Sequence, residues 1–328
     1  MSAHRMCVSR WLRLAVLPFM LVGSAAVYGG EATAGEIALR RAIAWQVALD
    51  RVGYSPGLID GKIGAKTRMA TCEFQRVRGL PQTGELDDAT TSALKIDPDG
   101  VLGRYAIASS DFEEIGPVPK SWVAKSQLER LGYESLDEVL SEKFHCTRGL
   151  LEMLNPGRSI GGLKVGDKVI VPILPPAEPD PKAAYVEVNL AEKVIRVIDA
   201  DRKLAALFHC SIAKDRSNLP PHDGRVACVV HDPWYTFDPA KWPEVKERVP
   251  GKLSIPPGPK NPVGRCWIGL SLPGYGMHGT PNPELIGKTG SHGCFRLANW
   301  DARRLAKMVS VGTPVKFVNR PTSVLARR

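Results

Sequence analysis

The sequence predicts a multidomain α+β protein in which a helical N-terminal half precedes a mostly β C-terminal domain. The first observation is length, because 328 residues exceed one average domain. The second is a change of hydrophobic period, from helical spacing in residues 36 to 94 to an alternation of two after residue 184. The third is a Pro-rich stretch at residues 175 to 183, which predicts a stiff linker.

The first thirty residues have the features of a secretory signal. Three arginines precede an apolar run at residues 14 to 22, and small residues follow it. This run is too short to favour a membrane span. We therefore expect a signal peptide at residues 1 to 30, export of the protein, and membrane contact only through the signal or an uncleaved anchor.

Residues 36 to 97 predict a small three-helix domain. Leu39, Ile43 and Val47 recur every four residues, which is typical of one face of a helix. Phe74 and Val77 indicate a second helix after a turn rich in Gly and Asp.

Residues 112 to 174 form a second expected unit, a small α/β module. Two short helices are predicted at residues 136 to 144 and 150 to 154. No opening strand is evident in this unit before Tyr133.

Residues 184 to 320 predict the mostly β domain. Short apolar runs alternate with tight turns, which favours a β-sandwich-like or barrel-like architecture. A Pro-rich segment at residues 233 to 262 carries four aromatic side chains, and we interpret it as a loop or lid at the border of an active-site cleft. Residues 300 to 309 predict one helix before the last strand.

The net charge of +10 is unevenly distributed. Residues 31 to 181 carry 18 basic and 22 acidic side chains, whereas residues 182 to 328 carry 23 and 12. A basic domain favours a polyanionic partner. Nucleic acid is not expected, because no recognisable nucleic-acid-binding module accompanies the charge.

A thiol, two imidazoles and a guanidinium lie within nineteen residues of the C-terminal domain. Cysteine attacks as a thiolate, so an enzyme must provide a base or cationic neighbours for it. This segment has both, and it predicts nucleophilic catalysis with the backbone N–H groups of Gly293 and Cys294 as oxyanion donors. The segment consists of His278-Gly279 and Ser291-His292-Gly293-Cys294-Phe295-Arg296.

A metal site is the alternative reading of the same residues. His278, His292 and Cys294 would make a zinc-binding set, but the short spacing of His-Gly-Cys is unusual for zinc ligands. We therefore expect thiol chemistry without a metal or organic cofactor.

At these positions the chain resembles the L,D-transpeptidases of bacterial cell walls. The resemblance covers roughly residues 184 to 319. It includes Asn261-Pro262-Val263-Gly264-Arg265, Met277-His278-Gly279-Thr280, Ile286-Gly287, the segment from Ser291 to Asn299, and Gly312-Thr313-Pro314-Val315.

The resemblance implies roles for the individual residues. Cys294 corresponds to the acyl-accepting nucleophile and His278 to the base, with the Gly279 carbonyl orienting the imidazole. Arg296 corresponds to the residue that organises the site. For His292 and Ser291 we expect hydrogen bonding or shaping of the oxyanion pocket. The resemblance also implies acylation of the cysteine by carbapenems.

The N-terminal units resemble wall-binding modules. The Gly-, Asp- and Gln-rich turns of residues 53 to 84 are similar to a three-helix peptidoglycan-binding domain, and residues 155 to 172 are similar to the second half of a lysin motif. Peptidoglycan, through its stem peptides and glycan, is therefore the implied partner, and a wall-anchored protein is an alternative acyl acceptor. Carboxypeptidase activity, crosslink hydrolysis, a metal-dependent hydrolase and a purely wall-binding protein stay open as alternatives.

Five further cysteines follow the signal. A bridge between Cys210 and Cys228 is conceivable because they lie in consecutive strand-like runs, and buried thiols are equally compatible with the pattern. The remaining three are Cys72, Cys146 and Cys266.

Overall fold

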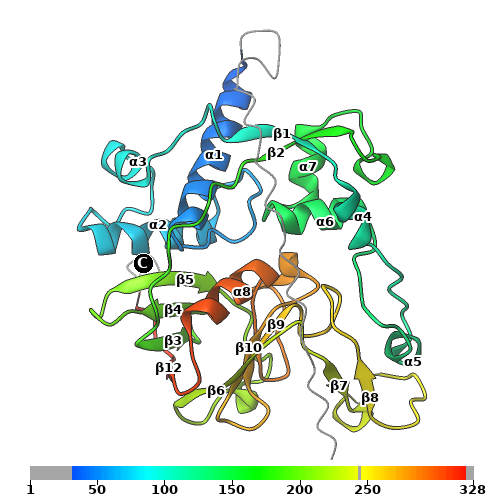
Figure 1. Ribbon diagram of the computed structural model, residues 1–328. Coiled ribbons are helices and arrows are strands. Elements are labelled where there is room, and N and C mark those ends of the chain that lie inside the picture. The colour runs from blue at the N-terminus through cyan, green and yellow to red at the C-terminus, as the bar shows by residue number, and fades with distance from the viewer. Residues whose placement is uncertain (1–31, 243–244, 323–328) are drawn as a thin grey trace, which may run out of the picture.

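The computed structural model describes residues 32–242 and 245–322. The expected signal peptide lies outside these residues. A helical region, a small two-stranded sheet with its helices, and an eight-stranded sheet follow one another along the chain (Figure 1). None of the helices in the described ranges is both long enough and apolar enough to cross a membrane.

The N-terminal region consists of α1 (Ala34–Arg51), α2 (Ala65–Arg78) and α3 (Asp88–Leu94). Thr33 and Glu36 form a capping box at the start of α1, which satisfies backbone N–H groups that have no partner inside the helix. The buried side of α1 includes Ile43 and Val47, as their spacing predicts. The helical character expected for this region is confirmed.

The second unit has the order strand, helices, strand. β1 (Leu102–Ala106) pairs antiparallel with β2 (Lys168–Pro172), and α6 (Leu136–Lys143) and α7 (Arg148–Leu154) lie between them in sequence. The helices occur where they were expected. The expected lower boundary at residue 112 is too late, because β1 precedes it. The short elements between β1 and β2 also include α4 (Ser109–Glu113), α5 (Trp122–Ser126) and η1 (Ile160–Gly162).

The C-terminal domain is built on one sheet with the strand order β11-β10-β9-β6-β12-β3-β4-β5. β6 joins the two halves of this sheet, because its first residues pair with β12 and the following ones with β9, with a bulge between Val226 and Cys228. The helix α8 (Asn299–Met308) packs against the sheet through Leu305 and Met308, where the main core of the domain lies. The strands are β3 (Tyr185–Asn189), β4 (Val194–Ile198), β5 (Leu204–His209), β6 (Gly224–His231), β9 (Cys266–Leu270), β10 (Gly276–His278), β11 (Phe295–Arg296) and β12 (Pro314–Val318).

The Pro-rich segment after β6 has its own secondary structure. β7 (Tyr235–Phe237) pairs antiparallel with β8 (Leu253–Ile255). Trp122 of α5 stacks on Phe237, with ring centroids 3.9 Å apart and planes inclined by 8°. This segment therefore packs on the second unit. Three further single turns are η2 (Arg216–Asn218), η3 (Pro239–Lys241) and η4 (Pro283–Leu285).

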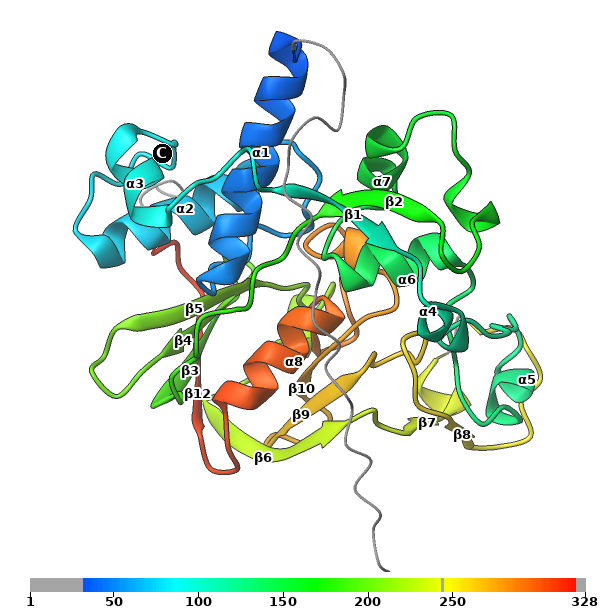
Figure 2. The ribbon, with the colours of Figure 1, turned by 45° about the horizontal axis from the view of Figure 1, so that its top comes forward.

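The helical region covers the β5 edge of the large sheet (Figures 1 and 2). The backbone N–H of Leu207 donates to the Gly53 carbonyl, and the N–H of Ser55 donates to the Leu207 carbonyl, both at 2.9 Å. Beside this junction, the buried Arg196 of β4 forms a 2.6 Å ion pair with the buried Glu73 of α2. Backbone pairing and a desolvated ion pair thus join the two regions.

The six cysteines that the structure describes form no disulfide with one another. Cys210 follows β5 and Cys228 lies on β6, and three strands separate β5 from β6 in the sheet. The bridge considered from the sequence is therefore wrong, since adjacency along the chain does not make these strands neighbours.

Candidate active site

Two adjacent strands carry the predicted nucleophile and base to one face of the sheet. β10 and β11 are parallel, and their register places Met277 opposite Phe295 and His278 opposite Arg296. Met277 and Phe295 are fully buried in the core. Because side chains alternate along a strand, His278, Arg296 and the preceding Cys294 belong to the opposite face from that core pair.

The orientation of His278 is set by its own neighbour in the chain. Its Nδ1 lies 2.6 Å from the carbonyl oxygen of Gly279. A carbonyl only accepts hydrogen bonds, so Nδ1 carries the proton and Nε2 presents its lone pair. Burial lowers the pKa of the imidazole to about 4, so it is neutral at pH 7. The indole of Trp267 stacks on the ring at a centroid distance of 5.5 Å.

The Cys294 thiol is partly exposed and faces backbone groups of the segment before β10. Its Sγ donates to the Gly274 carbonyl oxygen at 3.4 Å. Burial raises the pKa of the thiol, while a backbone hydrogen bond from Gly276 and the charge of Arg296 act to lower it. The neutral thiol is therefore the resting form, and activation requires that its proton be removed.

Arg296 is the electrostatic neighbour that Cys294 and His278 share. Its guanidinium donates to the Gly290 carbonyl at 3.3 Å, and its charge acts to lower the pKa of both groups. Within the described residues Cys294 and His278 have no hydrogen bond to each other. Such contacts are often long in the absence of substrate, so the arrangement stays compatible with proton transfer between them.

The turn before Cys294 is held by Ser291. Its Oγ donates to the Cys294 carbonyl at 2.5 Å and accepts the N–H of Gly293 at 3.2 Å. The N–H of Gly293 is therefore engaged, and the expectation that it serves as an oxyanion donor is not supported. The Cys294 N–H has no acceptor among the residues that the structure describes, which makes it the better oxyanion donor.

His292 is exposed and points toward the Pro-rich segment. Its ring lies edge-on to Trp242, at a centroid distance of 4.3 Å and an angle of 63°. In the described part of the chain, His, Cys, Asp and Glu side chains form no group of three or more that could hold a metal ion. His278, His292 and Cys294 thus do not make the zinc-type set considered from the sequence.

The structure adds neighbours that sequence reasoning did not single out. Tyr235 interacts electrostatically with Cys294 and Arg296, and burial raises the pKa of its phenol. The aromatic content of residues 233 to 262 was the available signal for Tyr235 and Trp242. Gly274 and Gly276, whose backbone faces the thiol, carry no signal, because only the fold brings them there.

Asn299 is a second unpredicted neighbour, behind His278. Its Oδ1 accepts the backbone N–H of Arg265 at 3.1 Å, and its Nδ2 donates to Glu142 at 2.9 Å. A Cβ atom added at Gly264 or at Gly279 would lie 2.1 Å from Asn299 Oδ1. Both glycines are therefore required by close packing around this amide.

Comparisons with known proteins agree with this geometry. Residues 183–317 match the L,D-transpeptidase catalytic domain family, and residues 42–94 match the "Putative peptidoglycan binding domain" family. The chain is 30% identical over 184 residues to "Putative L,D-transpeptidase YkuD" of Bacillus licheniformis, covering 56% of this chain and 93% of that protein. It is 31% identical over 153 residues to "Putative L,D-transpeptidase YqjB" of Bacillus subtilis, covering 45% and 78%.

Solved structures show a weaker likeness. The L,D-transpeptidase from Xylanimonas cellulosilytica aligns with 84% of this chain and 92% of its own, at 17% identity and a TM-score of 0.33. The sequence relatives carry the assignment, because the chain spans nearly the whole of a protein to which it is 30% identical. This chain belongs to the L,D-transpeptidase family.

Proposed function

We propose that the protein crosslinks peptidoglycan stem peptides, with Cys294 as the nucleophile and His278 as the base. The observation that carries the proposal is the state of His278. Its buried imidazole is neutral at pH 7, its Nδ1 proton is engaged by Gly279, and its Nε2 lone pair is left to take a proton. Cys294 and Arg296 share its face of the sheet.

In the first half-reaction, His278 takes the thiol proton as Cys294 Sγ attacks the carbonyl carbon of the third residue of a tetrapeptide stem. The negative charge that develops on the carbonyl oxygen is stabilised by the Cys294 N–H. The C–N bond to the terminal D-alanine then breaks, and His278 returns the proton to the leaving amine. A thioester on Cys294 results.

In the second half-reaction, an amine from a neighbouring stem attacks the thioester. His278 takes a proton from the amine as the new amide C–N bond forms, and it gives this proton to the sulfur of Cys294 when the C–S bond breaks. Tyr235, beside Cys294, and Trp242, against the ring of His292, are placed to keep water from the thioester. This favours crosslinking over hydrolysis to a tripeptide.

We further propose that residues 36–97 hold the enzyme on the wall and that residues 1–30 direct its export to the periplasm or cell wall. The match of residues 42–94 to a peptidoglycan-binding family supports the first point. The interpretation of this unit as a lysin-motif-like glycan-binding module stays a hypothesis, suggested by the antiparallel pair β1 and β2 with α6 and α7 between them in sequence.

The test is product analysis with muropeptides that carry tetrapeptide stems. The purified protein should release D-alanine and form dimers joined through third residues, identified by mass spectrometry. Cys294→Ala should form neither product, His278→Ala should lose acylation while its thiol is still alkylated, and Cys228→Ala, which removes another partly buried thiol, should match the wild type. A carbapenem adduct should map to Cys294.

Other product patterns contradict the proposal. Tripeptide monomers alone, with acceptor amine in excess, would show a carboxypeptidase, and loss of existing crosslinks would show a hydrolase. If the enzyme joins the stem to a wall-anchored protein and forms no dimers, the acyl acceptor is that protein and not a second stem. In parallel, Cys294→Ala should still sediment together with whole sacculi. If high salt abolishes this binding, the charge of the protein holds it on the wall, and not residues 36–97.

A further inference from the structure

The chain that leads into the catalytic turn is held from outside the catalytic domain. Residues 283–290, which we call the approach segment, begin with η4 and end at Gly290, directly before Ser291. Lys66, near the start of α2, donates from its Nζ to the carbonyl oxygen of Ile286 at 2.8 Å. A side chain of the N-terminal region thus contacts the middle of the approach segment.

The backbone of Lys66 is fixed as well as its side chain. Nε2 of the buried His209, at the end of β5, lies 3.3 Å from the Lys66 carbonyl oxygen. Because a carbonyl accepts, this nitrogen carries the proton, and burial keeps the ring neutral by lowering its pKa to about 3. The stem of Lys66 also packs against Gly57, where an added Cβ atom would lie 3.0 Å from Lys66 Cδ. Lys66 therefore presents its ammonium group from a fixed position.

The bond to Ile286 is a strong one for its surroundings. The ammonium group is partly buried, and burial and the charge of Lys288 lower its pKa. Ile286 is itself buried, and among the described residues no other donor reaches its carbonyl. A charged donor binds a carbonyl more strongly than a neutral one, and a buried acceptor that loses its partner is costly. We therefore expect this contact to restrain the approach segment.

The approach segment is in turn bonded to Arg296. The N–H of Gly287 donates to Ser211 Oγ at 2.9 Å, and the backbones of Ser211 and Arg296 exchange hydrogen bonds of 2.9 and 3.0 Å. At its end, the carbonyl of Gly290 accepts from the Arg296 guanidinium at 3.3 Å. Arg296 lies opposite His278 in the register of β10 and β11. A displaced approach segment would thus disturb the residue that neighbours both the thiol and the base.

We propose that Lys66 is a positioning residue for acyl transfer, through which the N-terminal region holds the catalytic turn in place. The link to acyl transfer rests on the proposed function. Lys66 acts on the peptide unit of Ile286 and not on the reacting atoms. Displacement of α2 from the sheet would release that unit and loosen the turn, so the N-terminal region sets the reactivity of the thiol as well as the location of the enzyme.

Lys66 differs in this respect from other contacts between the two regions. The backbone pairing with Leu207 and the ion pair of Glu73 with Arg196 end on β5 and β4. The partner of Lys66 lies instead on the segment that leads into Ser291. Removing Lys66 should therefore change reactivity more than it changes overall stability.

The test variant is full-length Lys66→Met, which keeps an apolar stem and removes the donor. Hydrogen–deuterium exchange, followed by mass spectrometry, should be faster in peptides that cover residues 283–296. The maximal rate of carbapenem acylation at Cys294 should fall about five- to tenfold, the effect of one lost hydrogen bond. The carbapenem concentration that gives half of this rate should change by less than about twofold, because Lys66 positions the turn and does not bind the ligand.

Two pairs of variants serve as controls. Lys66→Arg restores a charged donor and should recover part of the lost rate, whereas Lys288→Met removes a neighbouring exposed charge and should acylate at the parental rate. Ser211→Ala releases the Gly287 N–H and should reproduce both the faster exchange and the slower acylation. Ser254→Ala, which removes an exposed hydroxyl of β8, should change neither.

Parental exchange or parental acylation in Lys66→Met would overturn the proposal. An equal loss in Lys288→Met would assign the effect to charge, and no recovery in Lys66→Arg would show that the donor is not what matters. A lower midpoint of thermal unfolding with unchanged acylation would leave Lys66 a purely structural role. If the wild type itself is not acylated, the proposed function fails, whereas the exchange measurement still reports whether Lys66 holds the approach segment.

Discussion

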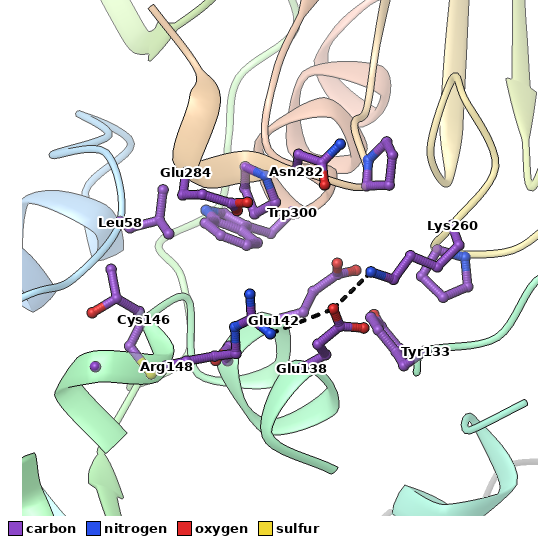
Figure 3. Close-up of a pocket in the computed structure, with 16 residues that line it drawn as sticks. Leu58, Tyr133, Glu138, Glu142, Cys146, Arg148, Lys260, Asn282, Glu284 and Trp300 are labelled. Atoms are coloured by element: carbon purple, nitrogen blue, oxygen red, sulfur yellow. Dashed lines mark hydrogen bonds and ion pairs between the residues drawn. The ribbon is translucent and has the colours of Figure 1, made fainter. Parts of the chain in front are cut away.

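The turn that carries Cys294 differs from the pocket of about 250 Å³ between the second unit and the catalytic domain (Figure 3). The two differ in how their polar groups are paired and in how far apart their residues lie. In the turn, Ser291 satisfies two backbone groups within three residues and leaves the Cys294 N–H for a substrate. The pocket is lined by residues from Leu58 to Trp300, and two of them, Ser141 and Trp300, each keep one buried side-chain atom without a hydrogen-bond partner among the described residues. A site built from neighbouring residues can be predicted from the sequence, whereas a site formed between domains is found only from the structure.

Gly279→Ala should have the largest effect, because the Gly279 carbonyl orients His278 and its backbone packs against Asn299. Its new Cβ would lie 2.1 Å from Asn299 Oδ1, so the backbone that orients His278 must move. We expect carbapenem acylation of Cys294 to slow by about 100-fold or more, since misplacement by about 1 Å costs that much. Stopped-flow absorbance measures the rate.

The matched control is Gly251→Ala, where an added Cβ meets nothing within 4 Å. It should acylate at the parental rate. Adding Asn299→Ala to Gly279→Ala should recover part of the lost rate by removing the atom that clashes. A Gly279→Ala protein with normal acylation would show that this packing does not position the base.

Ser291→Ala should have an intermediate effect confined to the turn. It removes the hydrogen bond to the Cys294 carbonyl and releases the Gly293 N–H. Two lost hydrogen bonds of about 1 kcal/mol each predict acylation slowed by roughly 10- to 30-fold, with alkylation of Cys294 preserved. Ser254→Ala is the control, and faster acylation in Ser291→Ala would instead mean that the released N–H serves as an oxyanion donor.

The pH dependence should show the smallest effect. Because burial lowers the pKa of His278 to about 4, the imidazole stays neutral as the pH falls through 6.5. Acylation should therefore change little from about pH 8 to about pH 5 and fall only below that. A half-maximal rate near pH 6.5 in a pH series of carbapenem acylation would contradict this.

The lowered pKa of His278 also makes the stability of the fold depend on pH. The unfolded chain, with an ordinary histidine, binds more protons than the folded chain between pH 6.5 and about 4. Stability rises with pH wherever the unfolded state binds more protons, so His278 destabilises the fold on acidification through this window.

The sequence predicted the parts of the molecule that depend on neighbouring residues. The site comes from two short segments, Met277 through Gly279 and Ser291 through Arg296. The pairing of β10 with β11 brings their side chains to one place. The apolar spacing of residues 136–144 predicted α6 because its buried face is local. β1 was missed because Gly103 weakens its strand pattern, and its partner β2 lies more than sixty residues later.

Other features depend on three-dimensional packing and left no pattern. Tyr235 comes near Cys294 only because β7 and β8 pair, and Asn299 meets Gly279 only through the fold. The engagement of the Gly293 N–H depends on the rotamer of Ser291, which composition does not reveal. Strand order likewise decided against the bridge between Cys210 and Cys228.

The pairing of Gly53 and Ser55 with Leu207 limits how this enzyme can be divided. A fragment that starts at the catalytic domain would leave β5 with bare backbone N–H and C=O groups, a template for self-association. It would also leave Arg196 without Glu73, one of its buried counter-ions. The wall-binding region is thus not an interchangeable attachment, and its excision should be judged first by aggregation, before any loss of targeting is interpreted.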